Sequence, residues 1–326
     1  MRVLVTGATG FTGGHLARAL AGRGYYVRAL VRHTPRAAAL GDSGIDLVAG
    51  DIRDRSAVRL ACHDIDVVYH IAAVYRQAGL KADTYRAVNA DAVRTLIHAA
   101  AGEHVKRVVH CSTVGVHGDV KQPPGTEDAP LNPGDIYQQT KLDGERQARE
   151  AAAATGVEVV IARPSGIYGP GDRRLLKLFR GVARRRFVVL GRGRIYYHLT
   201  YIDDLVEGFR LCGEVPAAAG RTYILAGGEV TTLNQLVTLI AREAGVKPPR
   251  LHLPVLPFWL AGAACEVVTA PFGIEPPIYR RRVDFFTKSR AFDITRARKE
   301  LGYAPKVGLR EGIRKTLEWY RAAGWL

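Results

Sequence analysis

Tyr137 and Lys141 lie four residues apart in the sequence YQQTK and could together move a proton. Residues at this spacing share one face of a helix, so a phenol and an ammonium would lie side by side. The spacing alone also fits a turn of a surface helix. A second segment, TGATGFTG at residues 6–13, predicts a bound dinucleotide. The two segments together predict hydride chemistry.

The glycine-rich segment directly follows an apolar run at residues 3–5 and precedes a predicted helix. In such a turn Gly7 permits the tight bend, Gly10 lets the backbone approach a pyrophosphate, and Gly13 lets the helix pack closely on its strand. Free N–H groups at the helix N-terminus would then face the phosphates. Between a strand and a helix this motif is strong evidence for a dinucleotide.

Strand-like and helix-like segments alternate through the first half of the chain. The predicted strands cover residues 3–5, 26–31, 45–49, 67–71, 107–112 and 157–162. The predicted helices cover residues 13–22, 83–101 and 137–155. This alternation predicts an α/β fold with a doubly wound parallel sheet covered by helices on both faces.

After about residue 163 the pattern becomes less regular, with clusters of proline and glycine at 163–171 and 254–277. We therefore expect a dinucleotide-binding domain over 1–165, to which the chain returns near 195–210. Residues 166–326 are expected to form mainly a smaller, substrate-binding lobe over the C-terminal ends of the strands, where ligands bind in open α/β sheets.

The cysteine content and the net charge restrict the compartment and the binding partners of the protein. The four cysteines are far apart and no metal-ligand spacing is present, which predicts a reduced, cytoplasmic protein without a metal site. Met1 runs straight into the first strand, so no N-terminal targeting segment is expected. The formal net charge is +16. No nucleic-acid motif accompanies this charge, which leaves a solvated basic surface or a site for phosphate-bearing substrates or anionic lipid.

Further motifs follow in order along the chain. They are Gly50-Asp51-Ile52, HIAA at 70–73, Asn89, CST at 111–113, Arg163-Pro164, Tyr168-Gly169-Pro170, Tyr201-Ile202-Asp203-Asp204 and a tail from Phe292 to Pro305. With the first two segments they resemble the extended short-chain dehydrogenase/reductase family, within the NAD-dependent epimerase/dehydratase superfamily. The nearest branches are the 3-beta-hydroxysteroid-dehydrogenase-like and dihydroflavonol-reductase-like enzymes. The resemblance implies a Rossmann-type fold.

The resemblance also implies roles for individual residues. Tyr137 would be the catalytic acid/base, and Lys141 would lower its pKa from about 10 and bind the nicotinamide ribose. Thr113 would hydrogen-bond the reacting oxygen, whereas Ser112 is more typically structural. Asn89 is included among the cofactor-binding residues, although a structural role is the more common one. The implied cofactor-binding residues are Gly7, Thr9, Gly10, Phe11, Thr12, Gly13, Arg32, Asp51, Ile52, Ala72, Ala73, Asn89, Tyr137, Lys141, Pro164 and Gly166.

The end of the second predicted strand bears on the choice of nicotinamide. NAD enzymes place a carboxylate there for the ribose 2′-hydroxyl. Here the position falls at Val31, and Arg32 follows. A guanidinium pairs with a 2′-phosphate that a carboxylate would repel, so we expect NADP in preference to NAD. The alternative is that Arg32 only stacks on adenine.

The family that the chain resembles includes several classes of reaction, which the residues distinguish in part. Dehydratases and decarboxylases usually carry an acid just after the catalytic threonine, and residues 114–117 offer none. Nucleotide-sugar epimerases usually hold the diphosphate with an asparagine and an arginine at positions that correspond here to Gly166 and Tyr197. We therefore favour hydride transfer between a secondary alcohol and a ketone on an apolar substrate. A nucleotide-sugar 4-epimerase with tightly bound NAD, and a non-catalytic NADP-sensing protein, remain alternatives.

The segment 251–274 is apolar apart from Glu266 and His252, and three arginines follow at 280–282. Its prolines and Gly262 argue against a spanning helix, which needs about 20 apolar residues. The segment is either a helix of the substrate lobe or, through residues 251–282, a peripheral contact with a membrane or lipid substrate. The family resemblance further implies a homodimer formed through residues 83–101 and 137–155.

Overall fold

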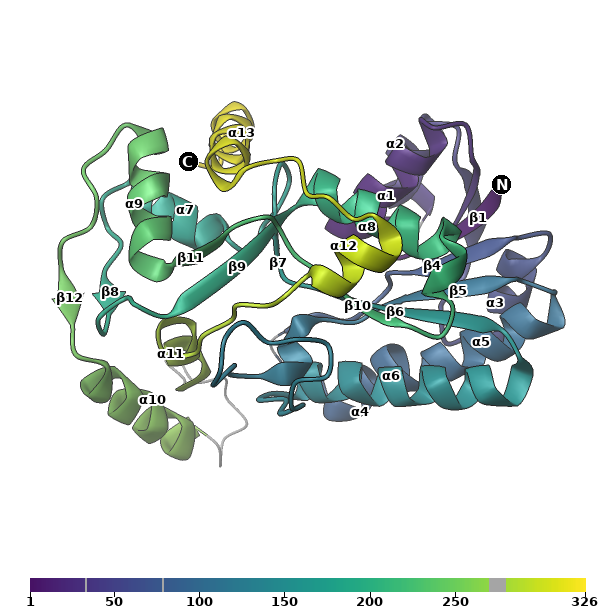
Figure 1. Cartoon of the computed structure of the whole chain (residues 1–326), viewed down its shortest axis with the longest axis horizontal. Helices are drawn as coiled ribbons and strands as arrows, with labels where there is room; N and C mark the ends of the chain where they lie inside the picture. Colours follow the sequence, from purple (N-terminus) through teal and green to yellow (C-terminus); the bar gives the residue numbers. More distant parts are fainter. Residues whose placement is uncertain (33, 78, 270–279) are drawn as a thin grey trace.

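The largest sheet of the computed structural model is parallel and has seven strands, in the order β10-β6-β5-β4-β1-β2-β3 (Figure 1). The structure describes residues 1–32, 34–77, 79–269 and 280–326. The strands are β1 (Arg2–Thr6), β2 (Tyr26–Val31), β3 (Asp46–Ala49), β4 (Val67–His70), β5 (Arg107–Cys111), β6 (Glu158–Pro164) and β10 (Thr222–Leu225). The order reverses between β1 and β4, and a ligand crevice is expected at that point. The predicted Rossmann-type α/β fold is confirmed.

Helices cover both faces of this sheet. They are α1 (Phe11–Ala21), α2 (Thr34–Gly41), α3 (Arg55–Cys62), α4 (Ala82–Arg86), α5 (Ala92–Gly102), α6 (Ile136–Thr155) and α8 (Ile202–Glu214). α1 packs beside α8, and α3, α5 and α6 pack together. Successive residues of a strand point to opposite faces. In β1, accordingly, Val3 and Val5 belong to one buried core and Leu4 to the other.

The helix expected over 83–101 is interrupted. A π-helical turn (Ala87–Asp91) joins α4 to α5. A π turn inserts an extra residue into the helix and often occurs at functional sites. The turn contains the buried Asn89.

The second part of the chain adds two small sheets and six helices to the described structure. One sheet has the order β11-β9-β7 and the other β12-β8. Their strands are β7 (Gly166–Tyr168), β8 (Val189–Leu190), β9 (Tyr196–Tyr201), β11 (Val230–Thr232) and β12 (His252–Leu253). The helices are α7 (Leu176–Ala183), α9 (Leu233–Ala244), α10 (Val255–Thr269), α11 (Arg280–Thr287), α12 (Thr295–Leu301) and α13 (Leu309–Ala322).

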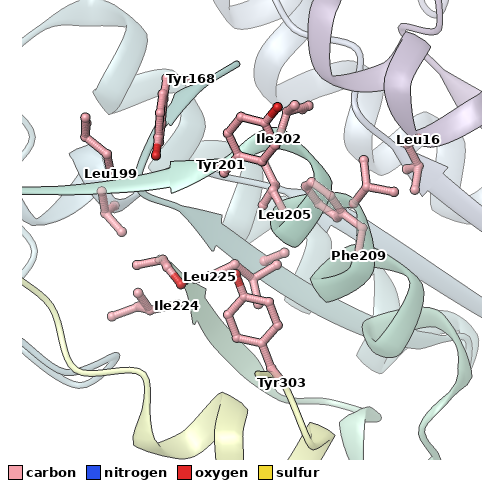
Figure 2. Close-up of a cluster of buried hydrophobic side chains, with 14 of the residues drawn as sticks. Leu16, Tyr168, Leu199, Tyr201, Ile202, Leu205, Phe209, Ile224, Leu225 and Tyr303 are labelled. Carbon is pink, nitrogen blue, oxygen red and sulfur yellow. Dashed lines mark hydrogen bonds between the residues drawn. The ribbon is translucent and has the colours of Figure 1, made fainter. Parts of the chain in front are cut away.

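The return of the chain to the large sheet extends further than the predicted 195–210. α8 packs against β4, β5 and β6, and β10 pairs with β6, so the return runs from residue 202 to residue 225. Figure 2 shows the buried core at this junction, where side chains of α8, β9 and β10 meet Tyr303. The two parts of the chain therefore share one core.

Candidate active site

The glycine-rich turn has almost no free space around it. A Cβ at Gly7 would lie 2.7 Å from the amide nitrogen of Ala72, and the φ angle of Gly7 is +73°. A Cβ at Gly13 would lie 2.3 Å from the carbonyl oxygen of Gly7. These contacts bring β1, α1 and the end of β4 together, as a close approach to a pyrophosphate requires.

A cavity of about 1700 Å³ lies over the C-terminal ends of β1, β2, β4 and β5. It brings together Thr113, Tyr137, Lys141 and all the predicted cofactor-binding residues except Asn89. The N-terminus of α1 opens into it through residues 9–12. The cradle therefore fits the phosphates of a dinucleotide, which would be held by backbone N–H groups at this helix end. Among the described residues, no three histidine, cysteine or acidic side chains are grouped to hold a metal ion.

Asn89 lies outside the cavity lining and is fully buried. Its amide oxygen accepts a hydrogen bond from the Val74 N–H at 2.8 Å. Its amide nitrogen donates to the Val74 carbonyl and to the Thr140 hydroxyl, both at 3.1 Å. Asn89 thus ties the loop after β4 to α6. The geometry supports the structural role rather than direct cofactor contact.

Tyr137 occupies the first turn of α6, whose N-cap is Asp135. The Asp135 carboxylate accepts a hydrogen bond from the Gln138 N–H at 2.9 Å, which fixes where the helix begins. Tyr75 meets the Tyr137 ring edge-to-face with 4.9 Å between the centroids. The guanidinium of Arg76 lies 5.9 Å from the same ring.

Burial raises the pKa of Tyr137. Cys111 and Tyr75 act in the same direction, whereas Arg76 and Arg174 lower it. The sequence predicted that Lys141 would lower this pKa below its usual value. That prediction is wrong for the net effect, because desolvation of the phenol outweighs the cations around it.

Lys141 is buried one turn further along α6. Burial lowers the pKa of its ammonium, and Cys111 and Glu145 oppose that change. Thr113 caps the short helix that follows β5, and its hydroxyl accepts a hydrogen bond from the Gly115 N–H at 3.0 Å. The hydroxyl hydrogen of Thr113 is therefore available to donate into the cavity.

A buried ionic network underlies these side chains, and the sequence did not reveal it. Glu145 of α6 accepts two hydrogen bonds from Arg163 of β6, at 2.8 and 2.7 Å, and one from Ser112 at 2.5 Å. Arg163 also bonds His117 at 3.1 Å. The network joins β5, α6 and β6 beside the cavity. The structural role expected for Ser112 agrees with this position.

Two stacked histidines lie at the C-terminal ends of β4 and β5, where His70 is the last residue of its strand and His110 the last but one. The rings of His70 and His110 are 5.5 Å apart, and both are completely buried. Burial lowers the pKa of His70 to about 3 and that of His110 well below its usual value, and Lys141 contributes in both cases. Both rings are therefore neutral at pH 7.

At the opposite end of the cavity, Arg32 follows β2 directly and is exposed. Asp51 pairs with Arg53 at 2.8 Å, and this pair lowers the pKa of Asp51, with a further contribution from Arg32. Arg32 and Asp51 therefore lie close together, in the part of the cavity where the sequence predicts the adenine and its ribose.

The other side of the cavity is built by the C-terminal part of the chain. Tyr197 is buried, its hydroxyl donates to the Phe285 carbonyl, and its ring lies 5.1 Å from that of Phe285. Phe286 packs on Phe285 at 5.0 Å and on Phe187 at 6.0 Å. The cavity lining here also includes basic residues, namely Arg173, Lys177, Lys288 and Arg290. The wall is aromatic with a basic rim.

The comparison with known families shows to which family this fold belongs. A sequence model of the NAD dependent epimerase/dehydratase family matches residues 3–226, which include the whole large sheet except Arg2 of β1. The chain belongs to this family. The predicted resemblance to the NAD-dependent epimerase/dehydratase superfamily is confirmed. Several relatives of this family member are named as hydroxysteroid dehydrogenases, which agrees with the predicted branch.

Three relatives cover nearly the whole chain. The protein y4nL of Sinorhizobium fredii is 32% identical, over 97% of this chain and 94% of its own. Sterol demethylase protein B of Methylococcus capsulatus is 30% identical over 100% of both chains. The 3 beta-hydroxysteroid dehydrogenase/Delta 5→4-isomerase of Mycobacterium tuberculosis is 29% identical, over 98% of this chain and 90% of its own.

Solved structures are similar to this chain over nearly its whole length. The structure of gox2253 superimposes with a TM-score of 0.85 and 29% identity, and the match covers 99% of each chain. MoeE5 in complex with UDP-glucose and NAD has a TM-score of 0.78 and 26% identity, over 99% of each chain.

Proposed function

We propose that this protein is an NADP-dependent oxidoreductase that interconverts a secondary alcohol and a ketone on a largely apolar substrate. The observation that carries the proposal is the aromatic wall of Tyr197, Phe285 and Phe187 in the cavity that contains Tyr137, with Phe286 packed behind it on Phe285 and Phe187. Walls of aromatic side chains are typical of sites for apolar ligands. The names of the hydroxysteroid and sterol relatives support the same substrate class.

Each catalytic side chain has a distinct part in this reaction. Tyr137 donates a proton to the carbonyl oxygen in reduction and accepts the hydroxyl proton in oxidation. Thr113 donates a hydrogen bond to that oxygen, and Lys141 binds the cofactor ribose and supplies a positive charge on the same helix face. A bound nicotinamide cofactor supplies or accepts the hydride.

Two positions argue against a nucleotide-sugar substrate. A Cβ at Gly166 would lie 2.7 Å from a side-chain carbon of Leu199, so an asparagine there would displace Leu199. The phenol of Tyr197 is buried and committed to Phe285. Neither position holds a diphosphate. The UDP-glucose complex of MoeE5 and the basic residues of the rim keep a nucleotide-sugar 4-epimerase as the second candidate.

The preference for NADP rests on Arg32. Its guanidinium stands at the rim just after β2, the position from which a 2′-phosphate can be bound in two-pronged fashion. Asp51 is already ion-paired to Arg53, which reduces its repulsion of a phosphate. We infer that NAD binds more weakly.

The exposed face of α10 supports a contact with a lipid surface. No described helix is long and apolar enough to cross a bilayer. α10 is 15 residues long, or about 22 Å, and exposes Leu256, Leu260, Val267 and Val268 by 63%, 52%, 73% and 65%. Its one acid, Glu266, is paired to Arg280 at 2.7 Å, so that the helix carries no unpaired charge.

We infer that α10 lies in the interface of an anionic membrane, which the net charge of +16 favours. Residues 270–279, which the predicted contact through 251–282 includes, lie outside the described residues. α10 packs on α11, whose Phe285 lines the cavity, so an apolar substrate would have a short path from lipid to site. We further propose a cytoplasmic homodimer paired through α4, α5 and α6.

Turnover of apolar substrates tests the proposal. The purified protein is incubated with NADPH and a panel of hydrophobic ketones, and with NADP⁺ and 3β-hydroxysteroids, while absorbance at 340 nm is followed. We expect substrate-dependent turnover with NADPH above that with NADH. Turnover confined to UDP-sugars, without net change in cofactor, would overturn the oxidoreductase and establish the epimerase.

A further inference from the structure

Arg76 lies in the loop after β4 and lines the cavity beside Tyr137. Its guanidinium is 5.5 Å from the ring centroid of Tyr75 and 5.9 Å from that of Tyr137. One of its N–H groups donates to the Tyr75 hydroxyl at 3.3 Å. Arg76 belongs to none of the sequence motifs that predicted the site.

The acid that caps α6 also fixes this arginine. One Asp135 oxygen accepts the Gln138 N–H, and the other pairs with Arg76, at 2.9 Å from Nε and 2.7 Å from a terminal nitrogen. Two contacts from one planar guanidinium restrict its orientation. The start of the helix that carries Tyr137 and the cation beside it are therefore held by the same side chain.

Several charged or titratable groups surround the phenol. Cys111 comes from the end of β5, Tyr75 and Arg76 from the loop after β4, and Arg174 from the segment before α7. Arg174 is paired to Asp172 at 2.8 Å and lies over the Phe11 ring. The helix that carries Tyr137 itself contributes its N-cap Asp135 and Lys141. Lys288, which is paired to Asp284, also lines the cavity.

We propose that Arg76 is a positioning residue, held by Asp135, whose positive charge stabilises the ionised form of Tyr137. The proposal rests on the proposed role of Tyr137 in proton transfer. Opposite charge at this distance favours the phenolate. Loss of Arg76 therefore lowers the fraction of ionised Tyr137 at a given pH. The rise of the alcohol-oxidation rate with pH, which requires the phenolate, then moves to higher pH.

Nitration by tetranitromethane tests this without a substrate, because the reagent attacks phenolates. The rate at Tyr137 is followed by peptide mass spectrometry at several pH values in the wild type, Arg76→Gln and Arg76→Lys. Tyr196, 42% exposed and outside the cavity lining, is the internal standard. Arg59→Gln is the matched control, since Arg59 forms a surface pair with Glu103 at 2.7 Å.

We expect Arg76→Gln to slow nitration of Tyr137 about tenfold, which corresponds to a rise of about one pKa unit. Arg76→Lys should restore most of the rate, and Arg59→Gln and Tyr196 should be unchanged. If Arg76→Gln fails to fold by circular dichroism, Arg76→Met replaces it as the neutral variant.

An unchanged rate in the neutral variant, or a rate in Arg76→Lys as low as in Arg76→Gln, would overturn the proposal. The same variants are then assayed for turnover against pH. Absence of turnover in the wild type would remove the proposed function but leave the nitration result to decide the role of Arg76.

Discussion

At the scale of single residues, the phenol of Tyr137 is assigned the proton transfer. Tyr137→Phe removes the hydroxyl and keeps the ring that meets Tyr75 edge-to-face. We expect turnover to fall by about 10² to 10⁴-fold, while cofactor affinity and the melting temperature stay near those of the wild type. Steady-state rates and a cofactor titration measure both effects.

The control for this substitution is Tyr196→Phe, which removes an exposed hydroxyl outside the cavity lining. It should leave turnover unchanged. Full activity in Tyr137→Phe would remove Tyr137 from the mechanism.

The sequence predicted those site residues whose position follows from a strand end or a helix turn. The glycine turn, Thr113 and the pair of Tyr137 and Lys141 are of this kind, and all line the cavity. Arg76 could not be predicted, because its place beside Tyr137 depends on how the loop after β4 folds against Asp135. Nor could the pairing of Glu145 with Arg163, which joins residues far apart in the chain.

At the scale of secondary-structure elements, α10 is the helix that combines a mostly apolar sequence with little burial, since Gly262 is its one buried residue. We expect the double variant Leu256→Glu/Leu260→Glu to lose binding to vesicles of phosphatidylcholine with phosphatidylglycerol, since it places two charges on the face that would enter the lipid. Cosedimentation of the full chain with such vesicles is the measurement.

Leu60→Glu is the matched control, because Leu60 on α3 is 64% exposed but isolated from α10. It should bind vesicles like the wild type. If the wild type does not bind the vesicles and the α10 variant no longer forms a dimer, this face would instead be a contact with a second copy of the chain.

The strands and helices of the first half were predictable because each buries a regular apolar pattern between turn residues. β2 begins and ends at the predicted residues, and β1, β5 and α6 differ by one residue or so at their ends. α3 was missed because its eight residues are too few to show a clear helical period, although Asp54 caps it by accepting the Ser56 and Ala57 N–H groups. The short strands of the second lobe depend on partners distant in sequence, which local patterns do not reveal.

At the scale of the whole molecule, buried histidines make stability depend on pH. The pKa of His70 is lowered to about 3 in the folded chain, and burial also lowers the pKa values of His110, His117 and His198. The unfolded chain, with histidine pKa values near 6.5, then binds more protons below that pH. Stability is fully present above about pH 6.5 and falls as the pH drops toward the folded values.

Melting temperatures from pH 8 to pH 4 measure this effect. His70→Asn should flatten the dependence relative to the wild type, whereas His252→Asn, at an exposed position, should leave it unchanged. Equal slopes in the wild type and His70→Asn would contradict the assignment of this dependence to His70.

The central claim, an oxidoreductase that exchanges NADP at every turnover, is tested most directly by the cofactor itself. The purified protein is denatured, any released nucleotide is identified, and the cofactor-free chain is titrated with NADPH and NADH. We predict little retained nucleotide and tighter binding of NADPH, with the preference lost in Arg32→Ser. NAD retained in an amount equal to the protein would contradict the claim and indicate a cofactor recycled in place, as in an epimerase.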